Sequence, residues 1–478
     1  MAGARLMIDP DDLAVCLRVL DQAAELDKEH PDSVVVQRAV GRMFKTLKRR
    51  RRVEARDAKT SHDASIIAAT ATGSPNRIDD ETQGVALKSA TFGDSAGELL
   101  RPQGCYICKQ DYTRVDWFYH QLCPECAAFG HSKRNARADL AGRRALLTGG
   151  RAKIGMYIAL RLLRDGAHTT ITTRFPRDAM RRFAAMEDSA DWLHRLRVVG
   201  VDLRDPAQVV SLADMMASDG PLDILINNAA QTVRRSPGAY SALADAESAP
   251  LPPGQLPEHV TFGKPSQLHP AALSGALDAS KLSAEQVSSL ALVAGSASPE
   301  RISKGIAIDA GGLLPDLVDS NSWIQRVHEV DPLELLEVQL CNSVAPFILV
   351  SRLRHVLAAS PARRKYVVNV SAMEGQFSRR YKGPGHPHTN MAKAALNMLT
   401  RTSAEDMLAE GILMTAVDTG WITDERPHPT KMRLAEEGFH APLDLVDGAA
   451  RVYDPIVQGE NGTDLYGCFL KDYRPSPW

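Results

Sequence analysis

The chain has 478 residues, 44% of them apolar, and a formal net charge of −1 at pH 7. This near-neutral charge gives no global case for binding to nucleic acid or to a membrane surface. One domain rarely exceeds about 250 residues, so two or more folded segments are expected. No continuous apolar run reaches the about 18 residues of a membrane span, and the first residues lack the apolar core of a signal peptide. We therefore predict a cytoplasmic protein.

Residues 1–60 are predicted to form a helical hairpin with a basic end. Asp9 precedes an amphipathic run, and Pro31 interrupts the pattern before a second run that begins at Asp32 or Ser33. The second run ends in the basic stretch 48–52. This stretch is either a patch for a polyanion or, as we favour, a solvated helix end where cations complement the helix dipole. Residues 61–100 are rich in small and polar residues and are predicted to be a linker.

Residues 101–137 carry four cysteines in the pattern C-x2-C-x14-C-x2-C, namely Cys105, Cys108, Cys123 and Cys126. Four thiolates suit tetrahedral Zn²⁺, and in a reducing compartment this spacing favours a metal over disulfides. His120 could replace one thiolate, because H-x2-C-x2-C also has ligand spacing. We predict a zinc-binding module with a structural metal. The spacing leaves open whether the module binds a protein, binds nucleic acid or only holds a fold together.

Residues 140–478 open with a strand over 144–148 that runs into a glycine turn. An amphipathic helix follows, Gly166 ends it, and a β-branched strand begins at Thr169. A strand–turn–helix–strand unit of this kind places a pyrophosphate at the N-terminus of its helix. Glycine suits the turn because the backbone must bend sharply and approach the phosphates without a Cβ atom.

Three spaced motifs in this segment resemble the short-chain dehydrogenase/reductase family. They are T-G-x-x-x-x-I-G from Thr148, then Val201-Asp202-Leu203, then Asn227-Asn228-Ala229-Ala230. The resemblance implies an α/β fold of Rossmann type, a doubly wound parallel sheet preceded here by the helical segment and the zinc module. It implies that the cofactor is held by Gly149, Arg151, Lys153, Ile154, Gly155, Asp202, Leu203, Asn228, Ala229, Lys393, Gly420 and Thr423.

Several of these positions have an expected role or depart from the family pattern. Asp202 would accept from the adenine amino group, and Asn227 and Asn228 would tie the central strands and the cofactor together by side-chain hydrogen bonds. Lys153 stands where the family usually has glycine, so the turn is expected to differ and Lys153 to contact phosphate. Thr419 replaces the proline of the family's proline-glycine pair.

The end of the second strand predicts the cofactor. NAD enzymes of this fold carry an acidic residue there that bonds the ribose hydroxyls. This chain has Thr172-Thr173-Arg174 instead, and Arg174 could pair with a 2′-phosphate through two hydrogen bonds. Arg151 adds positive charge nearby. NADP(H) is therefore favoured over NAD(H).

Residues 236–328 interrupt the fold with a long insertion rich in Ala, Ser, Pro and Gly. Loops of this length are usually functional lids or disordered segments. We favour a mostly disordered insertion and retain a folded cap, or a partner-binding element, as the alternative.

The reaction centre departs most from the family pattern. Hydride transfer to a carbonyl needs a proton donor at the oxygen. The family uses a tyrosine four residues before a lysine, and Lys393 matches that lysine, but Thr389 stands at the tyrosine position. Asn342 matches the family's structural asparagine. Ser371 fits the family's serine at the strand end, although that serine often sits one place later, where this chain has Ala372. We predict that the loop between Ser371 and Lys393 supplies the donor, with Tyr381 as first choice.

His386 and His388 are further candidates for the proton donor. Two functions are consistent with these residues. The first is an NADP(H)-dependent oxidoreductase for an alcohol or carbonyl substrate. The second is an inactive dinucleotide-binding scaffold or sensor that engages a protein partner through its zinc module or basic helix. Homo-oligomers are common in the family and are expected here unless the insertion blocks them.

Overall fold

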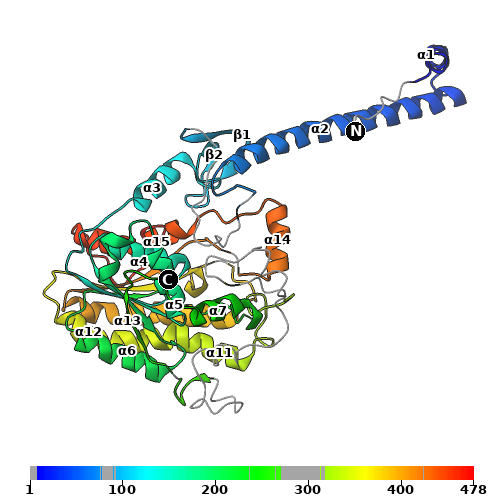
Figure 1. The fold of residues 1–478 in the computed structure, drawn as a ribbon. Helices are drawn as coiled ribbons and strands as arrows, with labels where there is room; N and C mark the ends of the chain where they lie inside the picture. Colours follow the sequence, from blue (N-terminus) through cyan, green and yellow to red (C-terminus); the bar gives the residue numbers. More distant parts are fainter. Residues whose placement is uncertain are drawn as a thin grey trace.

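The computed structural model describes residues 8–75, 77, 90, 93–235, 237–263, 265–270, 313, 318–379, 381–423 and 425–478. Its N-terminal part is a helical hairpin that extends away from the body of the molecule (Figure 1). Helix α1 spans Pro10–Glu25, and helix α2 spans Pro31–Ala69. The side chain of Asp9 caps α1 by accepting from the backbone N–H of Asp11 at 2.8 Å.

The second helix is longer than predicted. It passes the basic stretch and ends at Ala69, and a strand begins at Ser95. The predicted linker over 61–100 is therefore wrong at both of its ends, while residues 78–89 lie outside the described part of the chain. Composition misled the prediction because Ala, Ser, Lys and Asp are tolerated in a solvated helix whose stability depends on no apolar stripe.

A small module joins this arm to the body of the molecule (Figure 1). Strands β1 (Ser95–Gly104) and β2 (Asp111–Asp116) pair antiparallel, and helix α3 (Pro124–Arg134) follows. Val115, Tyr119, Leu122 and Ala127 are fully buried in its core. The four cysteines lie at the ends of these elements, as the predicted module requires.

The body is a nine-stranded sheet in the order β11-β10-β9-β8-β6-β3-β4-β5-β7. Every neighbouring pair is parallel except β10 with β11. The strands are β3 (Arg144–Leu147), β4 (His168–Thr173), β5 (Leu196–Gly200), β6 (Ile224–Asn227), β7 (Glu258–Thr261), β8 (Lys365–Ser371), β9 (Ile412–Asp418), β10 (Phe469–Lys471) and β11 (Arg474–Ser476). The seven strands from β10 to β5 give the predicted parallel sheet. Strand β7 comes from the insertion, so part of that segment is folded.

Helices cover both faces of the sheet, as the fold class predicts. Helices α4 (Lys153–Arg164), α5 (Pro176–Ala184) and α15 (Leu445–Glu460) pack on one face. Helices α6 (Pro206–Ser218), α12 (Ala345–Ala358) and α13 (Pro387–Leu408) pack on the other. The remaining helices are α7 (Ser241–Ser248) in the insertion, α11 (Pro332–Gln339) and α14 (His428–Glu436).

The helix over 332–358 is the one described helix long and apolar enough to cross a membrane, and 44% of that window is buried within the protein. Leu349, Leu353 and Leu357 on it are fully buried against the sheet. The packing of this helix against the sheet therefore accounts for its many apolar residues.

Candidate functional site

A cavity of about 950 Å³ opens where the central strands end. The glycine turn forms one side of it. Gly149 has a φ of +70°, and a Cβ atom there would lie 2.9 Å from the Cα of Ala229. A Cβ atom on Gly155 would lie 2.0 Å from the carbonyl oxygen of Gly149. Larger residues at these positions would clash with backbone, so the glycines let the first helix approach the strand end.

Lys153 follows this turn and lines the cavity. Its φ is +52°, in the left-handed region that favours glycine. A non-glycine residue held there costs on the order of 1–3 kcal/mol, and such strain concentrates at ligand-binding sites. Lys153, where the family usually has glycine, therefore has a strained backbone and brings a cationic side chain to the cavity.

Two asparagines at the end of β6, Asn227 and Asn228, tie the strand ends together. The Asn227 side-chain amide donates to the Asn369 side-chain oxygen at 2.8 Å, joining β6 to β8. The Asn228 side-chain amide donates to the carbonyl oxygens of Thr148 and Gly149 at 3.0 and 3.1 Å. Asn227 thus joins two central strands, as the sequence motif predicts, and Asn228 holds the glycine turn against the end of β6.

Arg174 lies at the end of β4 and lines the cavity. Its guanidinium lies 5.4 Å from the ring centre of Tyr240 and 5.7 Å from that of Phe175. Among the described residues no carboxylate lies within ion-pair distance of Arg174, whereas Arg151 pairs with Asp178. Aromatic rings hold the guanidinium without neutralising its charge, so Arg174 can still accept an anionic partner.

Asp202 also lines the cavity, but its carboxylate already has partners. Its oxygens accept from the guanidinium of Arg204 at 2.7–3.2 Å and lie 3.3 Å from Nε2 of His269. Arg204 also donates to Glu337 at 2.9 Å. Although burial opposes ionisation, the charge of Arg204 and the hydrogen bonds from His269 and Arg204 hold the pKa of Asp202 well below its ordinary value. Through Arg204, Asp202 therefore links the end of β5 to Glu337 of α11, in addition to any hydrogen bond that it makes to an adenine ring.

Lys393 and Thr389 lie one turn apart on α13, and both line the cavity. The Nζ atom of Lys393 donates to the carbonyl oxygen of Val370 at 2.8 Å. Burial lowers the pKa of Lys393 to about 8, while Cys341 and Glu374 favour its charged form. Thr389 is buried at the place of the missing tyrosine.

Ser371 and Asn342 both line the cavity, and their side chains are also hydrogen-bonded to other residues of the protein. The hydroxyl of Ser371 donates to the side-chain oxygen of Asn397 at 2.6 Å. The side chain of Asn342 bonds both backbone groups of Gln231, at 2.7 and 2.9 Å. Asn342 lies in one π-helical turn, Leu340–Val344, an irregularity that often marks functional sites.

The predicted proton donors of the loop before Lys393 do not reach the cavity. Tyr381 is 74% exposed and does not line it, so the first-choice prediction is wrong. His386 stacks on Trp323 at 4.0 Å, and its Nδ1 lies 2.8 Å from the carbonyl oxygen of Trp323. His388 is buried outside the cavity. His386 therefore packs against the insertion, Gln376 bonds the C-terminal residues at Pro477, and Arg379 is the residue of this loop's middle part that lines the cavity.

Sequence reasoning missed Asp418, which ends β9 directly beside Ser371 of β8. Its side chain lines the cavity and accepts from the backbone N–H of Gly420 at 2.9 Å. Burial raises the pKa of Asp418 to about 6. A carboxyl that holds its proton near neutral pH can act as an acid. Its position at the carboxyl end of a central strand was the available signal.

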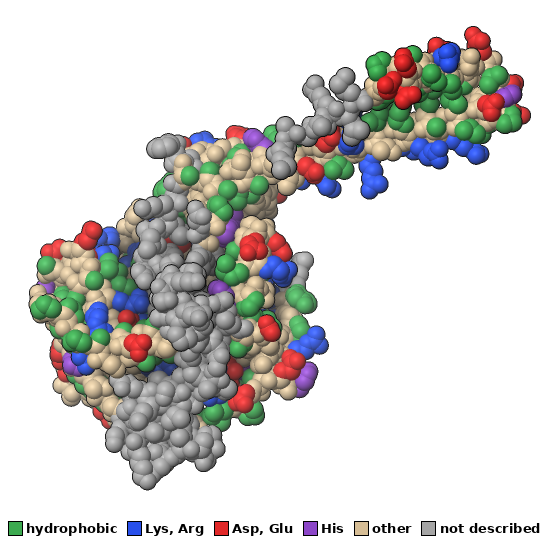
Figure 2. Space-filling view, turned by 45° about the vertical axis from the view of Figure 1, so that its right-hand side comes forward, with side chains coloured by type: hydrophobic (Ala, Val, Ile, Leu, Met, Phe, Trp, Pro, Cys, Tyr) green, Lys and Arg blue, Asp and Glu red, His purple; other side chains and the backbone are tan. Residues whose placement is uncertain are grey.

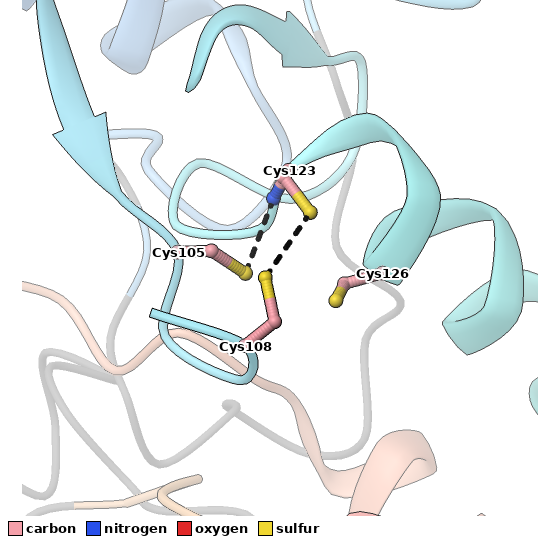
Figure 3. A group of neighbouring side chains, drawn as sticks. All are labelled: Cys105, Cys108, Cys123 and Cys126. Atoms are coloured by element: carbon pink, nitrogen blue, oxygen red, sulfur yellow. Dashed lines mark hydrogen bonds between the residues drawn. The ribbon is translucent and has the colours of Figure 1, made fainter. Parts of the chain in front are cut away.

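The four cysteines converge as predicted (Figure 3). Their sulfur atoms all lie within 4.8 Å of one another, and the Sγ atoms of Cys108 and Cys123 are 3.7 Å apart. Four converging thiols fit one tetrahedral Zn²⁺. His120 is not part of this group, because its Nδ1 lies 2.8 Å from the hydroxyl of Thr72, and burial lowers its pKa to about 3.

Comparison with known proteins gives one family match and several relatives. Residues 143–247 match the short chain dehydrogenase family. An uncharacterized protein of Acanthamoeba polyphaga mimivirus is 29% identical over 75% of this chain and 71% of its own length. A probable oxidoreductase of Streptomyces lividans is 42% identical over 19% of this chain, which spans only 29% of that relative.

The fold also has a distant counterpart among solved structures. A short chain dehydrogenase from Burkholderia cenocepacia, solved in complex with NADP, is 20% identical over 70% of this chain and 96% of that one, with a TM-score of 0.42.

Proposed function

We propose that the protein is an NADP(H)-dependent oxidoreductase for an alcohol or carbonyl substrate, of the short chain dehydrogenase family that residues 143–247 match. The observation that carries this proposal is the pairing of two cations at one cavity. Arg174 lies at the adenosine end implied by the glycine turn, and Lys393 lies where β8 ends. A dinucleotide with a 2′-phosphate would complement both charges.

The protein's own residues would bind the cofactor and manage the proton. Bound NADPH supplies a hydride to the carbonyl carbon, and the carbonyl oxygen must then receive a proton. Thr389 is unsuited to this role because an unassisted aliphatic hydroxyl is too weak an acid. Among the cavity-lining groups we assign the proton to Asp418, which pairs in register with Ser371 at the strand ends and lines the same cavity as Lys393.

This function is tested by mixing purified protein, NADPH and a broad panel of aldehydes and ketones, and by following the loss of NADPH absorbance. Turnover of at least one compound, lost in Lys393→Met, is the expected result. Measured NADPH binding without turnover of any compound would contradict the oxidoreductase and leave a nucleotide-binding protein.

A second candidate, a redox-inactive scaffold or sensor, has its own support. Thr389 occupies the tyrosine position, and the α1–α2 arm carries exposed apolar side chains, including Leu17, Val35 and Phe44. Figure 2 shows apolar side chains near the free end of the arm and basic ones along its edge. Deleting residues 8–60 should abolish partner capture or self-association while leaving NADPH binding intact. An unchanged molar mass and partner set after this deletion would count against it.

A further inference from the structure

One loop of the cysteine module forms part of the wall of the cavity. Tyr106 and Ile107 lie between the first two cysteines, Lys109 follows them, and all three line the cavity. They share it with the glycine turn and with residues 418–423. We call residues 105–109 the knuckle loop. The knuckle loop and residues 418–423, which lie more than 300 residues apart in sequence, therefore both contribute to the wall of one cavity.

The module is fixed firmly to the sheet domain. Arg134 at the end of α3 pairs with Asp444 at 2.5 Å and with Asp447 at 3.0 Å. Lys133 pairs with Asp454 at 2.6 Å, and these three carboxylates are almost fully buried on or beside α15. The module also shares one apolar core with the domain, to which Ile422, Leu443 and Leu445 contribute. The knuckle loop consequently keeps a defined position at the cavity.

Tyr106 links the knuckle loop to residues 418–423. Its phenol oxygen accepts from the backbone N–H of Trp421 at 3.0 Å. A phenol has an ordinary pKa of about 10 and therefore carries its proton at neutral pH. Among the described residues this hydroxyl has no acceptor for its own hydrogen. The phenol can therefore donate to a ligand while it holds Trp421.

We propose that the knuckle loop is a ligand-binding element of the cavity, in which Tyr106 positions residues 418–423 and donates a hydrogen bond to an oxygen of the bound ligand. The proposal rests on the proposed NADP(H) function. The oxygen belongs either to the carboxamide of the cofactor or to the carbonyl group of the substrate. Because Cys105 and Cys108 fix both ends of the loop's turn, metal binding by the four cysteines supports ligand binding.

The test compares two tyrosines of the same module. Tyr106→Phe removes the hydroxyl at the cavity. Tyr112→Phe is the control, because its hydroxyl donates to the carbonyl oxygen of His120 at 2.8 Å and Tyr112 does not line the cavity. We expect Tyr106→Phe to raise the Kd for NADPH, or the KM for the carbonyl substrate, about fivefold to tenfold, and the control to change either by less than about twofold.

Two further ligand arms identify the contact. If the phenol contacts the cofactor carboxamide, Tyr106→Phe weakens NADPH but leaves 2′,5′-ADP, which lacks the nicotinamide half, unchanged. If it contacts the substrate, only the substrate KM rises. Unchanged values for NADPH and for the substrate would overturn the proposal. Failure of the wild-type protein to bind NADPH would instead overturn the proposed function.

Hydrogen exchange of the unaltered protein gives a second readout. NADPH should slow exchange at residues 106–109 and 421–423, and it should leave β2 over Asp111–Asp116 unchanged. Removal of the metal with a chelator should weaken NADPH binding by more than about tenfold, because metal binding provides folding free energy in small modules. The proposal would also be overturned if NADPH left hydrogen exchange at residues 106–109 unchanged and the chelator left the affinity for NADPH unchanged.

Discussion

Lys393 donates from its Nζ atom to the carbonyl oxygen of Val370 at 2.8 Å, which fixes a cation at the end of β8. Its pKa is lowered to about 8 by burial, with Cys341 and Glu374 opposing that shift. The ammonium is therefore present below about pH 8 and lost above it. We expect NADPH affinity to fall as the pH rises through this value. Binding titrations with NADPH at pH values from about 6.5 to about 9.5, on both sides of that pKa, check this expectation. Lys393→Met should remove the pH dependence of the affinity. A pH-independent wild-type affinity would contradict the role of Lys393.

Asp418→Asn should have opposite effects on activity and on stability. The folded-state pKa of Asp418 is raised by burial to about 6, with Lys471 opposing and Asp472 and Glu374 reinforcing the shift. Ionisation thus costs the folded state free energy as the pH rises from about 4 to about 6. Asn removes that cost, so we expect a gain of roughly 1–3 kcal/mol at pH 7 that disappears below pH 4.

Turnover of Asp418→Asn, by contrast, should fall by at least about a hundredfold if Asp418 donates the proton. Denaturant melts at pH 4 and pH 7, together with NADPH oxidation, measure both effects. Loss of stability at pH 7 would contradict the burial argument, and full turnover would remove Asp418 as the donor.

Tyr381→Phe should leave turnover and NADPH affinity within about twofold of the unaltered protein. The side chain is 74% exposed, and surface substitutions away from a site rarely have larger effects. Steady-state kinetics decide the matter. A loss of most of the turnover would mean that the loop folds over Lys393 in the working enzyme.

Purified protein should contain about one zinc ion per chain. Cys105→Ser or Cys126→Ser should release the metal and lower the melting temperature, because the four sulfurs converge within 4.8 Å. Cys16→Ser is the matched control, since Cys16 is exposed on α1 and far in sequence from the cluster. Metal analysis that finds no zinc in freshly reduced protein would refute the assignment.

The predictions that the structure confirms, namely the parallel sheet and the convergence of the four cysteines, rest on local sequence motifs. The glycine turn, the pair Asn227-Asn228 and the four cysteines depend on short-range spacing, so the parallel sheet and the sulfur cluster could be anticipated. Tyr106 and Asp418 could not, because their place at the cavity depends on contacts between distant segments. Tyr381 was misplaced for the same reason: its phenol suits the chemistry, but the chain path between Ser371 and Lys393 decides its position.

Strand β7 and helix α7 were missed because the composition of the insertion resembles a linker. Strand β7 nevertheless pairs with β5 along Arg197–Gly200, where an open parallel edge supplies backbone partners. Backbone pairing of this kind leaves little trace in composition.

The central claim is that this cavity binds NADP(H) through Arg174. Calorimetric titration of the purified protein with NADPH and with NADH tests it most directly, using Arg174→Ala and the control Arg164→Ala. Arg164 is suitable because it pairs with Asp188 away from the cavity. We predict one NADPH per chain, bound at least about tenfold more tightly than NADH, and a loss of roughly 1.5–3 kcal/mol for NADPH alone in Arg174→Ala. Absence of binding, or equal loss for both cofactors in Arg174→Ala, would contradict the account.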